Sequence, residues 1–136
     1  MTQAARYAFV GLAWLFLVGI VVQVFFIGLA LFAGSENLES HVTLGWILHM
    51  IPIVILIAAA LARPGRRTVL LAAALAVTVF IVPILATLRD SSDVIAALHP
   101  VGALLAFYLA VLVAVASLAP LRSAGPMLDP TLDPAR

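Results

Sequence analysis

The sequence contains no cysteine and no lysine, and only 10% of its 136 residues are charged. The absence of cysteine excludes disulfides, thiol catalysis, iron–sulfur clusters and zinc sites built on cysteine. The seven basic residues form no basic stripe, so nucleic acid is not an expected partner. Hydrophobic residues make up 65% of the chain, whereas a soluble domain has about half. This composition excludes an ordinary water-soluble fold and indicates an integral membrane protein, whose main partner is the lipid bilayer.

Four long segments carry no acidic or basic residue: 7–35, 40–62, 68–88 and 94–121. Each can hold about 20 helical residues, which is the length needed to cross about 30 Å of hydrocarbon. The predicted spans are Tyr7–Phe32, Val42–Ala62, Thr68–Thr87 and Ile95–Leu118. Their connections are short, so successive helices should run antiparallel. The sequence therefore predicts an all-α, integral membrane four-helix bundle of up-down-up-down topology over residues 1–119.

The arginines indicate how this bundle is oriented. Six of the seven would lie on one side: Arg6, Arg63, Arg66, Arg67, Arg122 and Arg136. The positive-inside rule places that side, with both termini, in the cytoplasm, so a bacterial cytoplasmic (inner) membrane is the expected location. Residues 120–136 contain four prolines and few apolar side chains, which predicts a disordered cytoplasmic tail.

Few polar side chains inside the spans can carry chemistry. They are Gln23 in the first span, His41 and His49 in the second, and His99 in the fourth. All three histidines lie in the outer halves of their spans, and ionisable groups inside a membrane are functional candidates. His41 and His49 are eight residues apart, about 80° around the helix and roughly 12 Å along it, so they bracket one broad face.

Prolines are expected to shape the spans. Pro100 is comfortable in a first helical turn, so the fourth helix should start near Leu98, with His99 close to its beginning. Pro52 and Pro83 lie inside spans and should kink them. They leave the carbonyls four residues before them, those of Leu48 and Val79, without an amide donor. Small residues also recur at every fourth position of the last span, which is typical of close helix packing: Gly102, Ala106, Ala110 and Ala114.

Imidazoles on two helices of such a bundle suit bis-histidine ligation of haem iron. His99 has to be one ligand, because it is the only histidine outside the second span. Its partner is His41 if the helix starts at Pro100, which we favour, and His49 if the helix starts at Asp93 and continues through a kink. A copper or zinc site is a weaker alternative, because His41 and His49 are too far apart to share one small ion.

Three further residues are predicted to border the haem b cofactor. Gly45 and Gly102 would make room for the porphyrin edge, and Gln23 lies near the depth of His49. Gln23 would either tune the iron through hydrogen bonds around the ligands or bond His49 directly, which would satisfy both groups.

Three segments carry a resemblance: VVQVFFIGLALF in the first span, HVTLGWILHMIP in the second and ALHPVGALLAF in the fourth. They resemble an uncharacterised family of small bacterial four-helix membrane proteins, although Gly102 stands where that pattern has asparagine. The architecture is also similar to the haem-binding half of respiratory b-type cytochromes, where histidines on the second and fourth helices clamp haem. That similarity implies at most one haem here, since this chain lacks a second, inner histidine pair.

Two functions of different class follow from the sequence. The first is a b-type membrane cytochrome with one haem, serving electron transfer to an unidentified redox partner or haem-based sensing. The alternative is a cofactor-free accessory subunit or a small transporter-like bundle, within a larger membrane complex or a homo-oligomer. An enzyme acting alone is not expected, because the spans contain no nucleophile–base pair and no carboxylate dyad.

Overall fold

The computed structural model describes residues 3–119, and within them it contains helices and turns but no strand. The long helices are α1 (Gln3–Phe32), α2 (Leu38–Ala62), α3 (Arg66–Thr87) and α5 (Leu98–Ser117). Short turns of helix, η1 (Ser35–Asn37), η2 (Leu88–Asp90) and α4 (Asp93–Ala96), connect them. Four helical segments are long and apolar enough to cross a membrane. The prediction of an all-helical chain with four membrane-length segments is confirmed, whereas the predicted tail lies outside the described residues.

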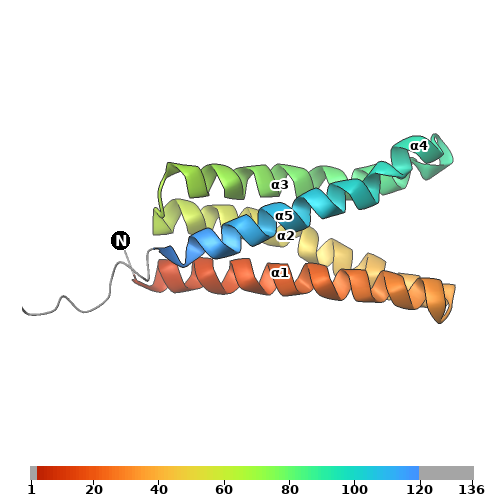
Figure 1. Ribbon diagram of the computed structural model, residues 1–136, viewed down its shortest axis with the longest axis horizontal. Helices are drawn as coiled ribbons and strands as arrows, with labels where there is room; N and C mark the ends of the chain where they lie inside the picture. Colours follow the sequence, from red (N-terminus) through yellow and green to blue (C-terminus); the bar gives the residue numbers. More distant parts are fainter. Residues whose placement is uncertain (1–2, 120–136) are drawn as a thin grey trace, which may run out of the picture.

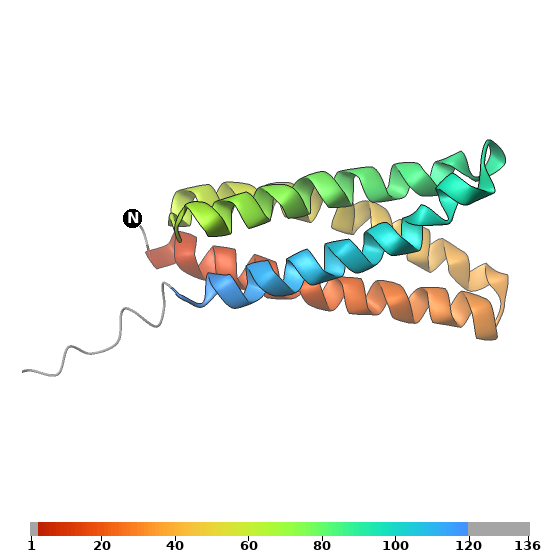
Figure 2. The same cartoon turned by 45° about the horizontal axis from the view of Figure 1, so that its top comes forward.

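The four long helices form a closed ring of contacts. Helix α1 packs against α2 and α5, and α3 packs against the same two helices. The start of α1, the α2–α3 turn and the end of α5 lie together at one end of the bundle (Figure 1). The turn η1 and the short α4 lie at the other end, toward which the helices diverge (Figures 1 and 2). We call these the arginine end and the histidine end.

Local chemistry explains the tight turn between α2 and α3. Arg63 adopts a left-handed conformation with φ 47°, and its N–H donates to the carbonyl of Ala59. Pro64 follows, and proline cannot continue a helix. Gly65 then has φ 115°, which a side chain would disfavour, before α3 begins at Arg66. The chain therefore reverses within three residues, so that α3 packs against α2.

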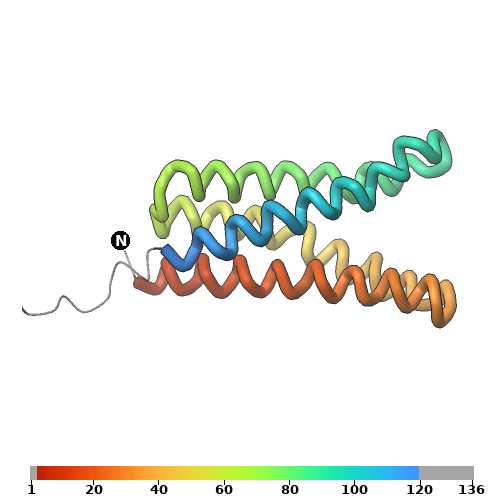
Figure 3. The backbone as a smooth tube through the Cα atoms, viewed as in Figure 1, coloured from red at the N-terminus to blue at the C-terminus, as the bar shows by residue number. Residues whose placement is uncertain are grey.

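The prolines take the positions that the sequence predicted. Helix α5 begins at Leu98, so Pro100 lies in its first turn and needs no amide partner there. Pro52 and Pro83 lie inside α2 and α3, which continue past them. The tube of α2 changes direction near its middle, as a proline inside a helix predicts (Figure 3).

The buried core occupies the arginine end and the middle of the bundle. The last buried side chain of α1 is Phe16, the last of α3 is Leu75 and the first of α5 is Ala106. On α2 no described side chain before Leu48 is buried. Among the described residues, the histidine end therefore has no buried side chain of its own. The alanines of the small-residue stripe on α5 are buried, so that stripe packs in the core.

Candidate functional site

Two of the three histidines lie close together at the histidine end. His41 is in the first turn of α2 and His99 is the second residue of α5. Their ring centroids are 6.4 Å apart, and the ring planes make an angle of 75°. Both side chains are only partly buried. The structure thus brings together the pair that the sequence favoured, because α5 begins at Leu98 and carries His99 to the level of His41.

Each of these two imidazoles contacts a backbone carbonyl of a neighbouring helix. Nδ1 of His41 lies 3.2 Å from the carbonyl oxygen of Gln23 on α1, and Nδ1 of His99 lies 2.8 Å from that of Val82 on α3. A carbonyl oxygen only accepts, so each Nδ1 is the donor and carries the proton. In a neutral imidazole the other nitrogen then keeps its lone pair. Both rings consequently offer Nε2 as a hydrogen-bond acceptor or a metal ligand.

The carbonyl that accepts the hydrogen bond of His99 is not one that the sequence singled out. Pro83 was expected to expose the carbonyl of Val79, but the imidazole bonds that of Val82, immediately before the proline. Sequence reasoning missed this contact because every residue has a carbonyl, and only the rotation of α5 against α3 selects one. The same applies to the main-chain oxygen of Gln23.

His49 lies deeper and apart from the pair. Its side chain is buried, and its ring centroid lies 4.7 Å from that of Phe80 on α3 and 5.8 Å from that of Trp46 on its own helix. Its Nδ1 has no hydrogen-bond partner among the described residues. The same is true of the side-chain oxygen of Gln23. The direct Gln23–His49 hydrogen bond considered from the sequence is therefore absent from the described part of the chain.

The two candidate glycines both lie at close helix contacts. A Cβ atom added to Gly45 would lie 2.8 Å from the side-chain nitrogen of Gln23, so this glycine admits the amide of α1. A Cβ atom added to Gly102 would lie 2.8 Å from Cγ2 of Val82, so this glycine lets α5 approach α3. Each glycine therefore packs beside one of the carbonyls that hold the histidines. Contact with a porphyrin edge stays a prediction for both.

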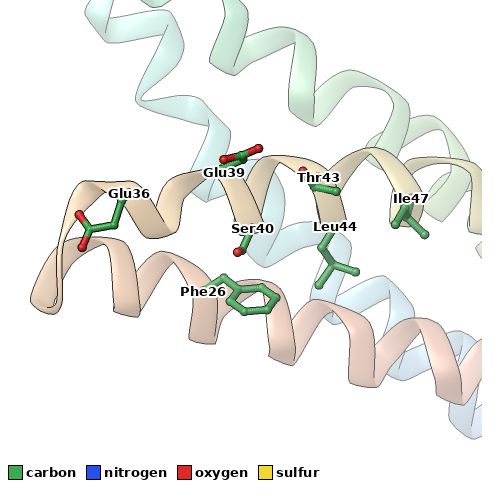
Figure 4. A pocket seen from close by; sticks show the side chains of 7 residues that line it. All are labelled: Phe26, Glu36, Glu39, Ser40, Thr43, Leu44 and Ile47. Atoms are coloured by element: carbon green, nitrogen blue, oxygen red, sulfur yellow. The ribbon is translucent and has the colours of Figure 1, made fainter.

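A depression on the outside of α1 and α2 lies near the histidine pair but does not include it. Glu39 and Thr43 extend to one side of α2, whereas Ser40 and Leu44 extend toward α1 (Figure 4). The full lining is Phe26, Glu36, Glu39, Ser40, Thr43, Leu44 and Ile47. Because these polar groups do not converge on one point, the histidine pair remains the better candidate site.

The pair can bind a metal only with help from other ligands. Among residues 3–119 no group of three or more His, Cys, Asp or Glu side chains could hold a metal ion. A zinc or copper ion bound by protein alone normally needs at least three such ligands. Haem iron needs only two axial ligands, because the porphyrin occupies its other four positions.

The comparisons with known proteins assign no activity to this arrangement. No curated protein and no solved structure matches the chain, and the predicted similarity to b-type cytochromes stays a prediction. One family model matches a segment that begins at Gln23, contains His41 and His49, and ends before His99. Residues 23–88, just under half of the chain, match the model of a family of unknown function, DUF6220.

Proposed function

We propose that the protein is a small b-type membrane cytochrome, in which His41 and His99 are the two axial ligands of one haem. The observation that carries this proposal is the spacing of the two rings. A metal–imidazole bond is about 2 Å and the ring nitrogen lies about 1 Å from the ring centre, so two imidazoles on opposite sides of one metal have centroids about 6 Å apart. The ring centroids of His41 and His99 are 6.4 Å apart.

The hydrogen bonds of the two rings support the same proposal. Histidines that bind metals usually donate their other N–H to a carbonyl or carboxylate, which fixes the ring orientation and leaves the ligating nitrogen unprotonated. Both rings have this arrangement: Nδ1 of His41 donates to the backbone carbonyl of Gln23 on α1, and Nδ1 of His99 donates to that of Val82 on α3. Two such rings from opposite halves of the bundle would approach a flat group between them from its two faces.

The distribution of the core is a further support. The buried side chains nearest the histidine end are Leu48 on α2, Leu75 on α3 and Ala106 on α5. Between these residues and the histidine end, none of the described side chains of the three helices is buried. An apolar, flat cofactor at this level would cover apolar surface that the helices do not cover for one another. A haem held by His41 and His99 would supply a one-electron redox couple and would have no free position for a diatomic ligand. Electron transfer is therefore preferred to gas sensing.

The proposed location is the bacterial cytoplasmic membrane, with four spans of alternating direction. The arginine end carries Arg6, Arg63, Arg66 and Arg67, whereas the loops of the histidine end carry Glu36, Glu39, Asp90 and Asp93 with Arg89. The positive-inside rule then places the arginine end, with both termini, in the cytoplasm. The haem would lie near the outer surface, where a redox partner could reach it.

The cofactor-free accessory subunit remains the second candidate, and one observation favours it. His41 and His99 already form hydrogen bonds with neighbouring helices. Such interhelical bonds stabilise a membrane bundle, and this stabilisation can be the whole role of the two histidines. Under this alternative, replacing either histidine would cost about 0.6–1.7 kcal/mol of stability and change no spectrum.

The deciding experiment is the absorption spectrum of the full chain, purified in detergent from cells that make haem. The cytochrome predicts a Soret band with the sharp reduced bands of low-spin, six-coordinate iron. His41→Ala and His99→Ala should each abolish the low-spin spectrum, whereas His49→Ala should keep it. Adding imidazole to His99→Gly should restore the spectrum, because a free ligand can occupy the space left by the side chain. A monodisperse, helical protein without any Soret band would overturn the cytochrome proposal and favour the accessory subunit.

A further inference from the structure

Another depression lies on the outside of α3 at the arginine end. Its lining is Arg66, Arg67, Leu70 and Leu71, so one half is cationic and the other half is apolar. Arg66 and Leu70 are four residues apart, as are Arg67 and Leu71, and side chains at this spacing are neighbours along a helix. Two adjacent rows therefore run from the end of α3 toward its middle, each with a guanidinium at its start and a leucine one turn farther in.

The two guanidinium groups have no carboxylate partner among residues 3–119. The carboxylates in that range all lie at the histidine end, and they are Glu36, Glu39, Asp90 and Asp93. Helix α3 begins at Arg66 without a side-chain cap, so the positive end of its dipole adds to the same positive charge. The cationic half of the depression therefore favours an anionic group that this part of the chain does not supply.

The leucines favour an amphiphile over a small soluble anion. Leu70 is 57% exposed and Leu71 is only partly buried, so both present apolar surface outside the bundle. They lie one turn, about 5.4 Å, farther into the membrane-length segment Arg66–Asp90 than the arginines do. A phospholipid has the same order of groups, because its phosphate lies at the membrane surface and its acyl chains continue into the hydrocarbon.

We propose that this depression binds an anionic phospholipid from the leaflet at the arginine end. Arg66 and Arg67 hold the phosphate, because a guanidinium donates two parallel hydrogen bonds to phosphate oxygens. Leu70 and Leu71 contact the beginning of the acyl chains. The affinity falls as the salt concentration rises, because salt screens charges at the membrane surface. A lipid bound here does not require haem, so this inference is independent of the proposed function.

The test is native mass spectrometry of the full chain released from detergent micelles, with phosphatidylglycerol or phosphatidylcholine of identical acyl chains added. The fraction of lipid-bound protein at several lipid concentrations gives an apparent Kd. We expect phosphatidylglycerol to bind more tightly, and Arg66→Gln and Arg67→Gln each to weaken its binding about fivefold. Arg63→Gln is the matched control, because Arg63 is exposed at the same end but does not line the depression, and it should leave the affinity nearly unchanged.

Two further measurements separate a lipid from a free anion. Inorganic phosphate in large excess should not displace phosphatidylglycerol, and Leu70→Ser should weaken its binding although no charge changes. The arginines are exposed, so their glutamine variants should keep the fold, which circular dichroism checks.

Four outcomes overturn the proposal. The first is equal affinity for the two lipids, and the second is wild-type affinity for phosphatidylglycerol in the double variant Arg66→Gln/Arg67→Gln. The third is a loss in Arg63→Gln as large as that in Arg66→Gln, which would show a general attraction to the arginine end. The fourth is displacement by phosphate alone, which would show a site for a free anion.

Discussion

Replacing Gly102 by alanine tests the contact that brings α5 against α3. The added Cβ would lie 2.8 Å from Cγ2 of Val82, whereas carbon atoms in contact normally lie about 3.5–4.0 Å apart. Valine has little rotamer freedom in a helix, so the two helices must separate by several tenths of an ångström or more. Overpacking of this kind costs about 1–3 kcal/mol, and replacing a glycine inside a helix by alanine returns about 0.5–1 kcal/mol. We therefore expect a net loss of about 1 kcal/mol.

The assay is thermal unfolding of the purified protein in detergent, followed by circular dichroism. Gly28→Ala on α1 is the matched control, because nothing lies within 4 Å of its Cβ position, and it should be neutral or slightly stabilising. Val82→Ala removes the colliding methyl groups, so the double variant Gly102→Ala/Val82→Ala should lose less stability than the sum of the two single changes. If Gly102→Ala is as stable as Gly28→Ala, or if the two losses simply add, α5 does not pack on Val82 through this glycine.

Two other predictions concern topology and core packing. A reporter fused after Arg136 and one inserted between Arg63 and Arg67 should both be cytoplasmic, and a reporter inserted at Asn37 should be external. If the first two reporters lie on different sides of the membrane, the four spans do not alternate in direction. Ala110 is 1% exposed in the core, so Ala110→Leu should lower the free energy of unfolding in detergent by about 1–3 kcal/mol. Ala116 is only partly buried, so Ala116→Leu should lower it less. Equal losses at the two alanines would show that the small-residue stripe is not the packed face.

The amino-acid sequence by itself determined the number of long helices and their approximate limits. The reason is that charged side chains are too costly in hydrocarbon, so the intervals between charges reveal the segments that can span it. It also favoured a start of α5 near Leu98 over a start at Asp93, since Pro100 is compatible with a first turn and disfavoured farther inside a helix. That start is what brings His99 level with His41, and it is why the favoured pair could be chosen before any contact was known.

The tertiary structure alone decided which groups meet. Helices that face lipid are apolar all round, so their sequences carry no strong signal of which side turns inward. The rotation of each helix therefore selects the carbonyls of Gln23 and Val82 as partners of the histidines, and it packs His49 against Phe80 without a hydrogen bond to Gln23. The concentration of the core at the arginine end is likewise set by how the helices diverge, which depends on contacts between residues far apart in the chain.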